Sequence, residues 1–158
     1  MESKIILNYT PSCSDLSVYD GFYVNSLEHN LSLFIGKELF FDVRSLSAND
    51  IISASTQLSG QNATFIVDSI MQVAFIKSVN PSANISFYYE KYSPNVLPFL
   101  ITNGFEVTFN YPTLAPERVN EMHSAGIKVN AVFLSKKDEV GVLKYYNVDY
   151  ITVNDSLK

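Results

Sequence analysis

The sequence predicts an α/β fold built on a parallel sheet, and three observations lead to this prediction. Short runs of β-branched and aromatic residues alternate with helical patterns of about ten residues. No hairpin turn signal joins consecutive runs, so successive strands need helical crossovers and should lie parallel. Some runs, such as 65–67 and 131–134, are apolar at consecutive positions, which is typical of strands covered on both faces.

The strand-like runs recur along the whole chain, and most of them are spaced by roughly the length of one strand-plus-helix unit. They are expected at residues 4–9, 38–43, 64–68, 85–89, 105–111, 128–134 and 149–153. Two arrangements fit this pattern, a TIM-like barrel with fewer strands than usual and an open doubly wound sheet. Periodicity alone does not choose between them.

The expected helices carry signals at their ends. Ser47, with Asp50 three residues later, marks one helix start, and Pro116 falls near the first turn of another. Gly36, Gly104 and Gly126 fall where helices should end, because a left-handed closing residue is least costly for glycine. One apolar side of the helix after residue 115 is expected in the core, formed by Val119, Met122 and Ile127.

Composition and charge argue against several classes of function. The chain has 158 residues and a formal net charge of -5, without a Lys/Arg cluster, so nucleic acid and anionic membranes are not expected partners. A single cysteine, Cys13, forms neither an internal disulfide nor a thiolate metal cage. From the sequence we expect no signal peptide and no membrane-spanning segment. The sequence predicts one domain over residues 1–158, in the cytoplasm or in an assembled particle.

Most of the chain resembles the glycerophosphodiester phosphodiesterase family, whose fold is a (β/α) TIM barrel. The segments that carry the resemblance keep the family's order and spacing: residues 23–31, 38–44, 65–69, 76–81, 119–129 and 147–154. The clearest is 119–129, which is similar to "v-x-x-x-H-x-x-G-(L/I)-x-V", while 147–154 resembles the closing "G-V-D-G-I-I-T-D". The resemblance implies a TIM-barrel-like repeat with about seven parallel strands, lacking the family's first strand pair.

Active members of the family use two histidines as acid and base and an acidic pair that holds a divalent cation. By the resemblance, Asn8 and Tyr9 stand where the family has His and Asp, Asp42 where it has a metal-binding Glu, and Arg44 where it has a phosphate-facing Lys. A carboxamide does not titrate, and one carboxylate is a poor Mg or Ca site. The resemblance therefore implies a catalytically inactive domain with no cofactor, and with no metal unless Asp42 holds one.

Two readings of the remaining candidates stay open. Asp42 and Arg44 are expected on one face of one strand, either as a remnant anion or metal site at the strand's carboxyl end or as a pair that satisfies itself when buried. The only histidines, His29 and His123, fall in helical segments, where surface or cap roles are expected. The aromatic residues of 87–92 and 105–111 are expected to fill the core rather than to stack on a sugar.

Three functions follow from these observations. The first is a non-catalytic structural or interaction module in a larger assembly, such as a virion component. An incomplete barrel exposes strand edges, so this function includes a protein partner or self-association. The second is a Mg- or Ca-dependent phosphodiesterase whose missing residues come from another chain or from upstream sequence. The third binds a phosphate ester or sugar through Arg44 and nearby tyrosines without turnover.

Overall fold

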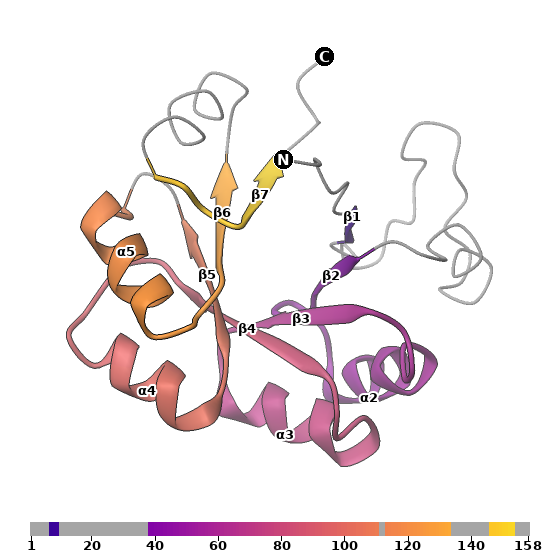
Figure 1. Ribbon diagram of the computed structural model, residues 1–158. Helices are drawn as coiled ribbons and strands as arrows, with labels where there is room; N and C mark the ends of the chain where they lie inside the picture. Colours follow the sequence, from indigo (N-terminus) through magenta and orange to yellow (C-terminus); the bar gives the residue numbers. More distant parts are fainter. Residues whose placement is uncertain (1–6, 10–37, 111–112, 134–145, 154–158) are drawn as a thin grey trace. The chain divides into compact units, whose positions relative to one another are not determined.

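Strands and helices alternate along the chain as the sequence predicts (Figure 1). The computed structural model describes residues 7–9, 38–110, 113–133 and 146–153. The chain divides into two compact units, Met1–Ile85 and Ser86–Lys158. Whether the two units fold together as the single expected domain stays a prediction.

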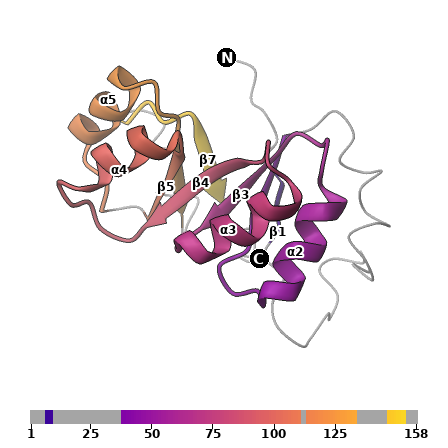
Figure 2. The same ribbon diagram turned by 90° about the horizontal axis from the view of Figure 1, so that it is seen from below.

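The first unit holds parallel strands joined by helical crossovers. Strand β1 pairs with β2, and β2 pairs with β3, with Leu39 opposite both Leu7 and Ala63. The two helices α2 and α3 lie side by side (Figures 1 and 2). The elements are β1 (Leu7–Tyr9), β2 (Leu39–Asp42), α2 (Ala48–Gln57), β3 (Ala63–Val67) and α3 (Ile70–Val79).

The second unit repeats the pattern. Strand β4 begins at the boundary of the two units, and β5 pairs in parallel with both β4 and β6, while β6 also pairs in parallel with β7. The elements are β4 (Asn84–Tyr89), α4 (Val96–Asn103), β5 (Glu106–Asn110), α5 (Pro116–Ser124), β6 (Val129–Phe133) and β7 (Tyr150–Val153).

The helix ends expected from the sequence are confirmed where the structure describes them. The Ser47 side chain accepts a hydrogen bond from the backbone N–H of Asp50 at 3.2 Å and so caps α2. Pro116 opens α5, where a missing N–H is not needed. Gly104 closes α4 with a φ of 66°, and Gly126 has a φ of 74°, both in the left-handed region. Gly36 lies outside the described residues.

Each unit has its own apolar core. In the first unit, the fully buried side chains come from both strands and helices: Phe40, Ile51, Leu58, Phe65, Ile66 and Ile76. In the second unit they include Leu100 of α4, Val107 and Phe109 of β5, and Val119 and Met122 of the predicted stripe of α5. Ile127, at the end of that stripe, is also buried. Among the described residues, no helix has the length and apolar character needed to cross a bilayer.

Candidate functional site

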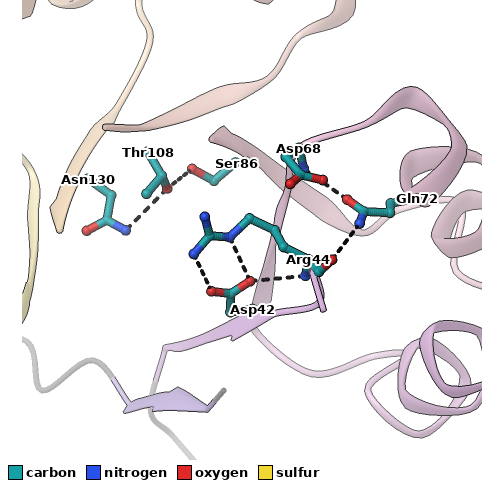
Figure 3. A network of polar contacts seen from close by, with 7 residues as sticks. All are labelled: Asp42, Arg44, Asp68, Gln72, Ser86, Thr108 and Asn130. Atoms are coloured by element: carbon teal, nitrogen blue, oxygen red, sulfur yellow. Dashed lines mark hydrogen bonds and ion pairs between the residues drawn. The ribbon is translucent and has the colours of Figure 1, made fainter. Parts of the chain in front are cut away.

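The carboxyl end of β2 carries a closely bonded charge pair within the described part of the first unit (Figure 3). The Asp42 carboxylate is buried, and its two oxygens accept hydrogen bonds from Nε and Nη2 of Arg44 at 3.0 and 2.8 Å. The backbone N–H of Arg44 donates to the same carboxylate at 3.1 Å. This bidentate geometry is the strongest form of the interaction between Arg and a carboxylate.

The expectation that Asp42 and Arg44 share one strand is wrong for Arg44. Strand β2 ends at Asp42, and Arg44 lies in the turn that follows, which a hydrogen bond from Leu46 N–H to the Val43 carbonyl closes at 3.0 Å. The turn folds the arginine back over the carboxylate, so the two side chains meet without strand alternation. The structure does show the two side chains paired, which was one of the two alternatives that the sequence left open.

The turn after β2 is also fixed to the start of α3. The Gln72 side chain donates from Nε2 to the Arg44 carbonyl at 3.3 Å, and its Oε1 accepts the backbone N–H of Asp68 at 2.9 Å. Ser69 caps α3 by accepting the N–H of Gln72 at 3.3 Å. The segments following β2 and β3 are thereby held together, with Gln72 bridging them (Figure 3).

The chemistry open to this pair follows from its charges. Both oxygens of Asp42 accept hydrogen bonds from Arg44, so a cation that approaches this carboxylate is repelled by the positive charge of the guanidinium. The Arg44 side chain keeps 30% of its surface exposed, and a guanidinium held in this way is suited to bind phosphate or carboxylate groups. Within the described residues, no three His, Cys, Asp or Glu side chains are grouped to hold a metal ion.

Two other predicted site residues lie next to β2. Asn8 is opposite Phe40 in the parallel register, and Tyr9 is opposite Phe41. The structure thus brings β1 beside the strand that ends at Asp42. The side chains of Asn8 and Tyr9 are outside the description, so their binding role stays a prediction.

The second unit contains a buried polar row that the sequence analysis missed. Ser86, Thr108 and Asn130 lie on β4, β5 and β6 and are at most 1% exposed. The hydroxyl oxygens of Ser86 and Thr108 are 2.6 Å apart, and Asn130 Nδ2 donates to Thr108 Oγ1 at 3.3 Å (Figure 3). Buried polar groups are usually hydrogen-bonded, and the bonds within this row link three adjacent strands.

The sequence did contain a signal for this row. Strand β5 alternates strictly between polar and apolar side chains over 106–110, and its partner strand reads apolar, polar, apolar over 129–131. Such alternation separates two unlike faces. The continuously apolar run 65–67 lacks this alternation, and all of β3 is buried.

The other face of the second unit is aromatic, as expected for core filling. Phe87 contacts Phe99 and Phe105 at ring-centroid distances of 5.0 and 6.2 Å, and Tyr89 continues the contact to Phe109 at 6.0 Å. Burial raises the pKa of the Tyr89 hydroxyl. These rings pack against one another. This supports the prediction that the aromatic residues of 105–111 fill the core, for residues 105–110, which the structure describes.

His123 has a specific partner rather than a free surface position. It lies near the end of α5, and its Nε2 is 2.8 Å from Oδ2 of Asp149, the residue before β7. The same oxygen accepts the backbone N–H of Val129 at 2.7 Å. The histidine therefore helps to join α5, β6 and β7. It belongs to the second unit, whereas Asp42 and Arg44 belong to the first. His29 lies outside the described residues.

Comparison by sequence finds no match, whereas comparison of structures finds proteins of similar fold. No family model and no curated protein matches the chain. A crystal structure of a protein assigned as a glycerophosphodiester phosphodiesterase from Galdieria sulphuraria is similar with a TM-score of 0.72 and 17% identity, covering 87% of this chain and 63% of that chain. A glycerophosphodiester phosphodiesterase from Parabacteroides distasonis has a TM-score of 0.61 and 17% identity, with coverage of 80% and 57%.

A third solved structure adds a ligand to the comparison. An Oleispira antarctica phosphodiesterase, solved in complex with the product sn-glycerol-3-phosphate, has a TM-score of 0.66 and 14% identity, covering 79% of this chain and 54% of that chain. The chain therefore has a glycerophosphodiester phosphodiesterase-like, TIM-barrel-type fold, as the sequence resemblance predicted. It spans between 54% and 63% of the length of these three proteins.

The first prediction concerns the Asp42–Arg44 pair. Arg44→Met should lower the free energy of unfolding by about 1–3 kcal/mol, because it leaves a buried carboxylate without its partner. Asp42→Asn in the Arg44→Met background should recover part of this loss, since the amide carries no charge. Chemical denaturation of the four combinations measures the coupling. Arg118→Met is the matched control, because its pair with Glu121 is exposed and should matter little.

The second prediction concerns the buried polar row. Thr108→Val keeps the shape of the side chain but removes the shared hydroxyl, so we expect a loss of about 1–3 kcal/mol in unfolding free energy. Thr56→Val, on the exposed surface of α2, is the control and should have a much smaller effect. Equal effects of the two substitutions would show that the row does not link the strands energetically.

Proposed function

We propose that this chain is a non-catalytic domain of the glycerophosphodiester phosphodiesterase-like fold, with a structural or interaction role in a larger assembly. The observation that carries the proposal is the bidentate contact between Arg44 and the buried Asp42. By the sequence resemblance, Asp42 stands at the position of a metal-binding glutamate. Its negative charge is balanced by an arginine of its own chain.

The chemistry of phosphodiester cleavage explains why this pairing matters. The reaction needs a cation to neutralise charge on the phosphoryl oxygens and groups that take and give a proton. A divalent cation at Asp42 would be repelled by the guanidinium of Arg44, whose Nη2 lies 2.8 Å from a carboxylate oxygen. Asn8, on the adjacent strand, has no titrating group. These features support loss of catalysis.

The interaction role is supported by apolar side chains on the surface. Ile70 and Met71, at the start of α3, are 52% and 64% exposed, and Ile101 on α4 is 55% exposed. Single exposed apolar residues are common, but two adjacent large ones form a surface that another protein can cover. The proposal therefore includes a protein partner or a second copy of the chain.

A second function is favoured by the exposure of Arg44. Its guanidinium is oriented by Asp42 at the carboxyl end of β2 and keeps part of its surface open to solvent. The similar Oleispira antarctica protein was solved with sn-glycerol-3-phosphate. We therefore also propose that the domain binds a phosphate ester or sugar phosphate without cleaving it.

The third prediction tests the loss of catalysis. The purified chain should not hydrolyse glycerophosphocholine or bis(p-nitrophenyl) phosphate above the buffer rate with Mg or Ca present. The same assay on the chain isolated together with its native partners examines an active site completed by another chain. Turnover that Asp42→Asn abolishes would contradict the proposal and establish a metal-dependent phosphodiesterase.

The fourth prediction tests phosphate-ester binding. Titration calorimetry with sn-glycerol-3-phosphate should give binding heat that Arg44→Lys reduces, because lysine keeps the charge but loses the planar, bidentate donor geometry. Arg118→Lys, on α5, should leave the heat unchanged. Inorganic phosphate in a parallel titration shows whether the glycerol contributes. Absence of heat with the wild-type chain rules out this second function.

A further inference from the structure

The end of helix α4 carries the only Asn-Gly sequence of the chain, Asn103-Gly104. Asn103 is the last residue of the helix and is exposed, and Gly104 is the residue that closes the helix. In such a pair, the backbone nitrogen of the glycine can attack the side-chain carbonyl carbon of the asparagine, because glycine has no side chain to hinder the approach. The pair is therefore a chemically reactive position as well as a helix end.

The reaction open to this pair is deamidation. A bond forms between the Gly104 nitrogen and Cγ of Asn103, and the amide nitrogen of Asn103 leaves as ammonia, carrying the proton of the Gly104 N–H. A cyclic imide remains. Water then opens the ring at either carbonyl, which gives an aspartate or an isoaspartate. The reaction needs no oxidant, metal or enzyme, and at neutral pH it adds one negative charge at position 103.

The folded helix keeps the two reacting groups from meeting. Nδ2 of Asn103 donates a hydrogen bond to the Phe99 carbonyl at 2.8 Å, so the side chain is directed back toward the preceding turn of the helix. The N–H of Gly104 donates to the Ile101 carbonyl at 3.3 Å. A nitrogen held in this way has to lose its hydrogen bond before it can attack. Ring closure therefore requires this end of the helix to open.

A third hydrogen bond connects the same helix end to the core. The N–H of Phe105 donates to the Leu100 carbonyl at 3.1 Å. Leu100 is fully buried, and the Phe105 ring lies 5.9 Å from the Phe99 ring and 6.2 Å from the Phe87 ring. We use the name α4 cap for the hydrogen bonds from Asn103 Nδ2, Gly104 N–H and Phe105 N–H. The packing of Leu100 and Phe105 sets how often the α4 cap opens.

We propose that Asn103 is a deamidation site whose rate is set by opening of the α4 cap. The inference does not depend on the proposed loss of catalysis or on ligand binding. Opening of a helix end costs less free energy than unfolding of the whole chain. The folded chain should therefore react slowly through local opening, and the unfolded chain much faster. The exposure of Asn103 gives water access for the second step.

The product weakens the helix end that protected its precursor. An aspartate at position 103 loses the amide donor to the Phe99 carbonyl, and its negative charge lies at the negative end of the helix dipole. An isoaspartate adds one carbon to the backbone before Gly104, whose φ of 66° closes the helix. The N–H of Phe105 then no longer reaches its carbonyl. Deamidation is thus a one-way step that loosens α4 from the aromatic core.

The fifth prediction is tested by incubating the purified chain at mildly alkaline pH and following the peptide that contains Asn103 by mass spectrometry. Leu100→Ala leaves a cavity under the α4 cap and should raise the deamidation rate about tenfold or more. Leu58→Ala is the matched control, because Leu58 is also fully buried at a helix end but belongs to the first unit. It should leave the rate unchanged. Circular dichroism verifies that both variants fold.

Urea provides a second arm that needs no core variant. Below the unfolding transition, the wild-type rate should change little with urea, because local opening exposes little surface, and it should rise to its upper limit once the chain unfolds. Asn103→Gln, which keeps an amide but closes a ring far more slowly, should keep its mass and serves as the chemical control.

Three results would overturn the inference. A folded wild-type chain that reacts as fast as the unfolded chain shows that the α4 cap gives no protection. An unfolded chain in which Asn103 stays intact shows that the position is not a deamidation site. Equal acceleration by Leu100→Ala and Leu58→Ala, or a wild-type rate that rises steeply with urea below the transition, shows that global unfolding rather than the α4 cap sets the rate.

Discussion

The central constraint on this chain is the burial of a carboxylate at the end of β2. Only 6% of Asp42 is exposed, and a charge in that position has to be balanced. Arg44 supplies the balance from the following turn, with two side-chain hydrogen bonds and one from its backbone. The turn is in turn fixed to α3 by Gln72. The same contacts that make this end of the sheet stable leave the carboxylate occupied, so structure and proposed loss of chemistry have one cause.

The two units balance their buried polar groups differently. The first unit uses an ion pair at a strand end, whereas the second uses neutral hydroxyl and amide groups in the middle of β4, β5 and β6. The side chains of this row do not ionise near neutral pH and are fully buried, which suits a role in holding strands together. Arg118 stacks on the Tyr92 ring at 4.4 Å, and its hydrogen bonds with Glu121 lower the pKa of that carboxyl.

Much of the fold was predictable because its signals are local. The Ser47 cap, the closing Gly104 and the apolar stripe with Val119 each depend on a few neighbouring residues. The site was less predictable because its contacts depend on the path of the chain. The turn that returns Arg44 to Asp42 has no distinctive sequence, and the row from Ser86 to Asn130 needs the register of three strands. Alternation of polar and apolar residues along 106–110 and 129–131 is the local sign of that row.

The most direct test of the account is whether Asp42 can hold a divalent cation. Mn²⁺ can be titrated into the labelled chain while backbone amide signals are followed by NMR, because a bound Mn²⁺ broadens the signals of nearby amides. We expect the amides of Val43 and Arg44 to keep their line widths in the wild-type chain. Arg44→Gln should increase the broadening, since the carboxylate is then released. Selective broadening around Asp42 in the wild-type chain, removed by Asp42→Asn, would contradict the account.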